Sequence, residues 1–115
     1  MNKNCTSLEQ SKKLAEILPL ESADMCYGID DDTLKYNNLP WLIPYHKYTA
    51  KEFYTPCWSL AALLNVLPKG TRLLKSATDD IYHCDCPKCN IDEWFDNPID
   101  ACYKLLLKLY ELKML

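Results

Sequence analysis

The feature that most constrains this 115-residue chain is the segment 97–112, in which apolar side chains occupy most of the helical directions. Asn97 is a preferred N-cap, Pro98 suits the first helical position, and Asp100 favours the positive end of the helix dipole. The polar side chains form one narrow arc, namely Asp100, Lys104, Lys108 and Glu111. The other directions are apolar, with Leu105, Leu106, Leu107, Leu109, Tyr110 and Leu112. So wide an apolar surface predicts a helix buried by the rest of the fold or by another chain.

An N-terminal helix is predicted from its capping residues. Two overlapping capping boxes mark its start, Thr6 with Glu9 and Ser7 with Gln10. Pro19 ends it, because the residue before a proline is disfavoured in the helical region.

A second helix is predicted between these two. Thr55 is a suitable N-cap and Pro56 suits the first helical position. Residues 57–67 are apolar on nearly every face, which is typical of a central helix.

Short strands are predicted in the remaining segments. Residues 25–29 form one, and the runs 71–75, 81–85 and 91–95 carry the β-branched or aromatic residues of an antiparallel meander. We therefore expect an α+β fold of three helices packed on a small, mainly antiparallel sheet, with the β-meander between the second and third helices. The length fits a single domain over residues 1–115.

Charge and hydropathy exclude some classes of partner. The net charge is −3, Arg72 is the only arginine, and no stretch concentrates basic residues, so nucleic-acid binding is not expected. No stretch reaches the ~18 apolar residues of a membrane span, and residues 1–20 lack the apolar core of a signal peptide. These features predict a cytoplasmic protein without a membrane partner, in which thiols stay reduced.

The densest group of chemically reactive side chains is the run 83–89, which contains one histidine and three of the seven cysteines. Cys86 and Cys89 have the C-x-x-C spacing of a zinc knuckle, and Cys84 would supply a third ligand from the same strand face. The fourth ligand would be His83, His46, Cys57 or a residue of a partner chain. In a second arrangement, a dimer would bind one zinc ion with Cys86 and Cys89 from each of its two chains, which also gives four ligands.

Two other interpretations apply to the same run. A redox pair needs its first cysteine at a helix N-terminus, and too few residues follow Cys89 for the usual supporting helix. Free cysteines are among the most buried residue types, so a structural role is favoured. We therefore expect no cofactor, with zinc at Cys84, Cys86 and Cys89 as the alternative.

Two further candidates come from single residues and from aromatic content. Cys57 stands near the expected start of the second helix, where a thiolate is stabilised, although burial of the thiol is the simpler interpretation. Aromatic side chains dominate interfaces, and the best candidate interaction surface comprises Trp41, Tyr45, Tyr48 and Tyr54.

Two segments resemble a known group of proteins. One is Pro56-Cys57-Trp58-Ser59-Leu60, continuing to Pro68, and the other is Asn97-Pro98-Ile99-Asp100-Ala101-Cys102, continuing to Leu112. Together they resemble small proteins without an assigned activity that phages and mobile elements of gut anaerobic bacteria encode. The resemblance covers about half of the chain and transfers no functional residue. It implies a plain hairpin between the second and third helices, from which the cysteine run departs.

These observations favour a non-enzymatic binding or accessory protein of phage or mobile-element origin. A protein partner is expected, and the C-terminal helix is a candidate homodimer interface. The alternative is a small zinc-stabilised interaction module that uses Cys84, Cys86 and Cys89. A thiol enzyme that uses Cys57 or the Cys86 and Cys89 pair is a third hypothesis.

Overall fold

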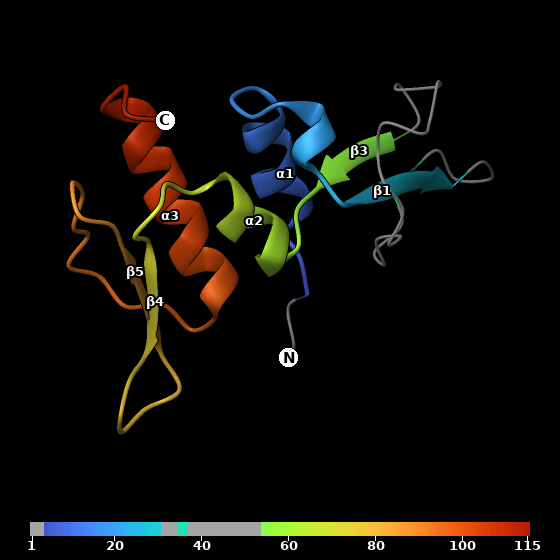
Figure 1. Cartoon of the computed structure of the whole chain (residues 1–115). Coiled ribbons are helices and arrows are strands. Elements are labelled where there is room, and N and C mark those ends of the chain that lie inside the picture. Colours follow the sequence, from blue (N-terminus) through green and yellow to red (C-terminus); the bar gives the residue numbers. More distant parts are fainter. Residues whose placement is uncertain (1–3, 31–34, 37–53) are drawn as a thin grey trace.

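The computed structural model describes residues 4–30, 35–36 and 54–115 and confirms the α+β fold class (Figure 1). A three-stranded antiparallel sheet lies at one end of the molecule, a two-stranded antiparallel sheet lies at the other, and the helices lie between them. In chain order the elements are α1 (Leu8–Ala15), the 3-10 helix η1 (Leu20–Ser22), β1 (Met25–Asp30), β2 (Lys35–Tyr36), β3 (Tyr54–Cys57), α2 (Leu60–Val66), β4 (Arg72–Lys75), β5 (Tyr82–Asp85) and α3 (Pro98–Glu111).

Helix α1 begins at one of the two expected capping boxes. The Gln10 amide donates to Ser7 Oγ at 3.2 Å, and the Ser7 amide donates to Gln10 Oε1 at 3.0 Å. Thr6 is instead buried, where its Oγ1 accepts a hydrogen bond from the Trp58 amide at 3.1 Å. The helix ends at Ala15, earlier than Pro19 requires, and a turn covers the intervening residues.

The prediction for the start of the second helix was wrong. Thr55, Pro56 and Cys57 belong to β3, which pairs with β1 at the edge of the sheet, where a proline costs no internal ladder bond. Ser59 is the true N-cap, and its Oγ accepts from the Ala62 amide at 3.2 Å. The shorter α2 is not the central helix, because only Ala62 and Leu63 are buried within it.

The first two strands of the expected meander are β4 and β5, which pair antiparallel from Arg72 with Asp85 to Lys75 with Tyr82. The expected third strand, residues 91–95, is reduced to a single bridge. There the Tyr82 amide donates to the Phe95 carbonyl at 2.7 Å, and the Phe95 amide donates back at 2.8 Å. The rest of this segment pairs with no strand among the described residues, so Trp94 stands outside the sheet.

Helix α3 begins as predicted, with Asn97 Oδ1 accepting from the Asp100 amide at 2.8 Å and Pro98 in the first turn. It packs against β5 and α2 (Figure 1). Six of its side chains are buried, namely Ile99, Ala101, Cys102, Leu105, Leu106 and Leu109. The covered surface is narrower than the sequence pattern predicts, because Tyr110 and Leu112 are about half exposed. Within the part of the chain that the structure describes, no helix is long and apolar enough to cross a membrane.

The main core joins α3, α2 and β5, and a smaller cluster lies against the three-stranded sheet. Trp58 is fully buried in the main core, and its indole N–H donates to Ser22 Oγ at 2.9 Å, which satisfies its one polar group. All seven cysteines are buried as free thiols. The thiols therefore fill the interior as small apolar groups.

The turn after α2 predicts a sensitive glycine. Gly70 has φ +87°, and a Cβ at this position would lie 3.0 Å from Pro87 Cγ. We expect Gly70→Ala to lower the free energy of unfolding by at least about 1–2 kcal/mol, because the left-handed conformation strains an L-residue and the Pro87 ring must also shift. Urea unfolding measures this loss.

Gly70→Asn separates the two causes, because asparagine tolerates the left-handed region better than alanine but has the same Cβ. A smaller loss for Gly70→Asn than for Gly70→Ala assigns the difference to backbone strain. An alanine variant as stable as the wild type would contradict the prediction.

Candidate functional site

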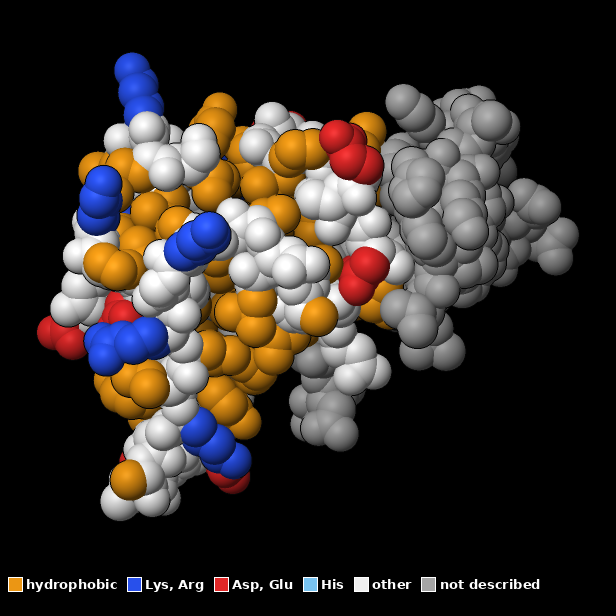
Figure 2. All heavy atoms as spheres, in the orientation of Figure 1, with side chains coloured by type: hydrophobic (Ala, Val, Ile, Leu, Met, Phe, Trp, Pro, Cys, Tyr) orange, Lys and Arg blue, Asp and Glu red, His pale blue; other side chains and the backbone are white. Residues whose placement is uncertain are grey.

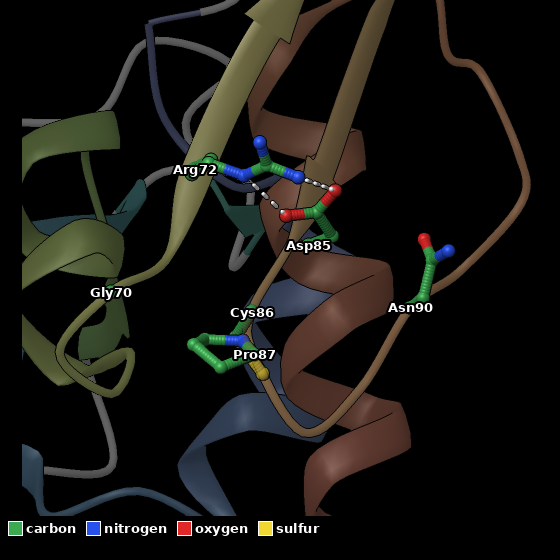
Figure 3. Close-up of a pocket in the computed structure, with 6 residues that line it drawn as sticks. All are labelled: Gly70, Arg72, Asp85, Cys86, Pro87 and Asn90. Carbon is green, nitrogen blue, oxygen red and sulfur yellow. Dashed lines mark hydrogen bonds and ion pairs between the residues drawn. The ribbon is translucent and has the colours of Figure 1, made fainter.

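A polar cavity of about 380 Å³ lies at the end of the β4–β5 hairpin. Figure 3 shows its residues: Arg72 from β4 faces Asp85 from β5, the turn residues Cys86 and Pro87 lie beyond them, and Asn90 extends from the segment that follows. Gly70 completes the lining, and its lack of a side chain leaves room for the Pro87 ring. This cavity combines a guanidinium, a carboxylate and an amide within one hollow.

Arg72 and Asp85 form a two-pronged ion pair across the hairpin. Arg72 Nε donates to Asp85 Oδ1 and Nη2 donates to Oδ2, both at 3.1 Å. The Arg72 side chain is 67% exposed, whereas that of Asp85 is 10% exposed. The arginine hydrogen bonds, with help from His83, hold the pKa of the Asp85 carboxyl below its usual range, although burial opposes them. A general acid or base needs a pKa near the working pH, so this carboxylate is better suited to a structural role.

His83 extends the same cluster into the protein. Its Nδ1 lies 3.1 Å from the Glu93 carbonyl, and its Nε2 lies 3.1 Å from Asp85 Oδ2. Both partners are oxygen acceptors, so the imidazole joins the Glu93 backbone to the Asp85 carboxylate. The ring centroid also lies 5.3 Å from that of Trp94. The Asp85 carboxylate therefore has two side-chain partners, Arg72 and His83.

The three cysteines of the candidate metal site do not face one another as a single group. Cys84 points toward α3, where its Sγ accepts from Cys102 Sγ at 3.8 Å. This contact lowers the pKa of Cys84 and raises that of Cys102. Cys86 and Cys89 close a two-residue turn, and each amide donates to the carbonyl of the other, at 3.0 and 3.1 Å.

All three thiols are enclosed, with Cys84 2%, Cys86 6% and Cys89 7% exposed. Among residues 4–27 and 55–115, whose side chains the structure describes, no three His, Cys, Asp or Glu side chains are grouped to hold a metal ion. His46, one of the expected fourth ligands, lies outside the described residues. Zinc at Cys84, Cys86 and Cys89 stays the alternative hypothesis, which a metal analysis must test.

The other expected site residues fall into two groups. Cys57 lies in β3 and is fully buried, and a hydrogen bond with Cys5 together with burial raises the pKa of its thiol. The raised pKa is the opposite of what an activated nucleophile needs. Trp41, Tyr45 and Tyr48 lie outside the described residues, and the structure describes only the backbone of Tyr54.

A second cavity of about 300 Å³ lies on the other side of the cysteine turn. It is bounded mainly by apolar side chains with two lysines among them, and its lining comprises Pro68, Lys69, Cys86, Pro87, Lys88, Leu109 and Met114. A cavity of this size is at the small end of those that bind ligands or side chains. Its lining comes from three elements that meet here: the end of α2, the cysteine turn and the end of α3.

The end of α3 shapes that cavity through a Schellman motif. Lys113 has φ 58°, its amide donates to the Tyr110 carbonyl at 3.0 Å, and the Met114 amide donates to the Leu109 carbonyl at 2.8 Å. The motif folds Met114 back so that it lines the cavity with Leu109. Besides Met114, which is 38% exposed, three apolar side chains close to one another in sequence are exposed, at 51%, 47% and 45% for Tyr110, Leu112 and Leu115 respectively, and we call these three the C-terminal apolar surface.

The sequence reasoning did not identify the cluster of Arg72, His83 and Asp85. A signal existed, because the only arginine and an aspartate stand in two strands that were expected to pair antiparallel. Placing them opposite each other needs the register, which depends on the conformation of residues 76–81. The side chains of the second cavity carried no local signal, because they come from three separate segments.

The lowered pKa of Asp85 predicts a pH-dependent stability. Because the folded-state pKa lies below the unfolded value of about 3.9, the stabilisation is complete above that value and is lost as the pH falls through the folded-state pKa. We expect Asp85→Asn to lower the free energy of unfolding at pH 7, and the difference from the wild type to shrink in strong acid. Urea unfolding at pH 7 and in strong acid measures this difference. Asp92→Asn is the control, because Asp92 is exposed. An equal difference at both pH values would contradict the assignment.

Zinc content is a direct test of the cysteine run. We expect purified protein to hold no stoichiometric zinc and to melt at the same temperature with and without EDTA. A structural zinc contributes ~10 kcal/mol or more to folding, so chelation would have a large effect. One zinc per chain, or one per two chains, with a large fall in melting temperature would show that the zinc alternative is correct.

Serine substitution identifies the role of the turn thiols. Because Cys86 and Cys89 are buried, each serine introduces a hydroxyl that costs about 1–3 kcal/mol if it finds no partner. We expect the double variant to fold with reduced stability that EDTA does not change further. Loss of folding to the level of a chelated wild type would instead identify both thiols as ligands.

Comparison of the chain with models of protein families, with curated proteins and with solved structures returned no match. The resemblance to proteins of phages and mobile elements therefore stays a prediction, and the functional argument depends on the geometry described above.

Proposed function

We propose that this is a non-enzymatic binding or accessory protein that takes a protein partner on the C-terminal apolar surface. The observation that carries the proposal is the exposure of Tyr110, Leu112 and Leu115 within six residues of chain. Single exposed apolar side chains are ordinary, but neighbouring ones of this size are typical of interaction sites.

The placement of this surface supports a binding role. It follows the buried part of α3, so its backbone is held by a helix that the core fixes. The Schellman motif continues that order to Met114. A preorganised apolar surface loses less conformational entropy on binding than a flexible segment does.

The chemistry of the described residues also supports binding over catalysis. Asp85 is held as a carboxylate by Arg72, and burial together with the hydrogen bond to Cys5 opposes ionisation of Cys57. The cytoplasmic location and the phage or mobile-element origin belong to the proposal on the grounds of composition and resemblance. A zinc-stabilised module remains the alternative, and the metal analysis above decides it.

Capture of a partner from cells that produce the protein tests the proposal. We expect wild-type protein to retain a partner, and Leu112→Asp to bind it at least tenfold more weakly, because the interface would bury an unpaired carboxylate. Leu74→Asp is the matched control, since Leu74 is 42% exposed but belongs to β4, a different element.

Equal capture by Leu112→Asp and wild type would contradict the proposed surface. A captured protein identical to the bait, whose capture Leu112→Asp abolishes, would instead identify the C-terminal helix as a homodimer interface, as the sequence pattern allows.

A further inference from the structure

We propose that two copies of this chain associate by placing Trp94 of each copy in the second cavity of the other. The inference concerns residues other than the C-terminal apolar surface, so it does not rest on the proposed function. It follows from two features of one chain that are complementary in shape and in charge.

The first feature is an exposed aromatic side chain in an acidic segment. Trp94 is 45% exposed, and it is the only tryptophan with large exposure among the described residues. Asp92, Glu93 and Asp96 surround it in sequence and are all exposed. The bridge between Tyr82 and Phe95 fixes the backbone beside it, and the His83 ring supports the indole. Tryptophan is the residue type most enriched among the energetic anchors of interfaces.

The second feature is the cavity of about 300 Å³ beside the cysteine turn. Leu109 and Met114 are among its apolar lining residues, and Lys69 and Lys88 are its two charged lining residues. Burial raises the pKa of the Cys89 thiol and the charge of Lys108 opposes that rise, so Lys108 lies near the turn, where it also pairs with Glu111 at 4.0 Å. An apolar cavity with cations around it is suited to an aromatic side chain flanked by carboxylates.

The distribution of charge favours the acidic segment around Trp94 of a second copy as the occupant of the cavity. The protein carries a net charge of −3, yet the charged side chains that line the cavity are both lysines. Figure 2 shows lysine and arginine side chains standing over the apolar surface on the side formed by β4, β5 and α3. The acidic segment of a second copy brings three carboxylates to these cations, and its tryptophan fills the apolar part.

A two-fold dimer would use both features of each copy. Trp94 lies beside His83 near the start of β5, and Cys86 borders the cavity just past its end. The four steps from Tyr82 to Cys86 span about 13 Å in an extended strand. In a symmetric dimer each copy gives one segment and one cavity, so every contact occurs twice. Trp94 and the cysteine turn that borders the cavity both follow β5, within nine residues of chain.

A charge-swap mixing experiment tests the proposal on the full chain. Lys88→Glu places a carboxylate in the cavity lining, and Glu93→Lys places an ammonium in the segment; both residues are exposed. Each variant alone opposes like charges at both contacts of its own dimer. An equimolar mixture allows a heterodimer of the two variants. One of its contacts joins Glu93 to Lys88 as in the wild type, and the other joins the two substituted residues, which have opposite charges.

Sedimentation velocity over a concentration series measures the outcome. We expect the wild type to dimerise, each single variant and Trp94→Ala to weaken the dimer at least tenfold, and the mixture to recover most of the wild-type affinity. Added salt should weaken the wild-type dimer, because its charge contacts are screened. Circular dichroism verifies that every variant is folded.

Three results would overturn the inference: a monomeric wild type over the whole concentration range, single variants that dimerise as well as the wild type, or a mixture that recovers nothing. Leu112→Asp is the control for the other interface, and we expect it to leave this dimer unchanged. If Leu112→Asp abolishes dimerisation and Lys88→Glu does not, the dimer uses the C-terminal apolar surface and the inference is wrong.

Discussion

The buried face of α3 is the contact on which the rest of the structure depends. Leu105, Leu106 and Leu109 are 0–1% exposed, and complete burial of one such side chain contributes about 1.5–3 kcal/mol. This face covers β5 on one side and α2 on the other. Gln10 of α1 also reaches the first turn of α3, where its Nε2 donates to Asp100 Oδ1 at 2.7 Å. The helix therefore joins elements from both halves of the chain.

The β4–β5 hairpin shows how packing and charge determine what the surface can do. On its inner side Cys84 meets Cys102 of α3, so the thiol is part of the core. On its other side Arg72 and His83 hold Asp85 as a carboxylate, and the His83 ring lies beside Trp94. The cysteine turn that follows separates the polar cavity from the apolar one, because Cys86 and Pro87 border both. One short hairpin thus positions both cavities and the acidic segment.

Predictions from the sequence succeeded where local interactions decide the structure. The start of α3 follows from Asn97 and Pro98, and the start of α1 follows from the capping box of Ser7 and Gln10, because each cap involves residues only three positions apart. The predictions failed at residues 55–57. A proline after a threonine favours a helix start locally, but the ladder with β1 offers hydrogen bonds and burial that outweigh this preference.

The sequence by itself determined the fold class, two of the three helix starts and the strands of the hairpin, since these depend on caps and on periodicity within short windows. Only the tertiary structure decided which thiols meet, which carboxylate pairs with Arg72, and which apolar side chains of α3 stay exposed. The physical reason is that these contacts join distant segments, such as Cys84 with Cys102 and the α2 end with the α3 end. Their geometry is fixed by register and helix packing, which no single segment specifies.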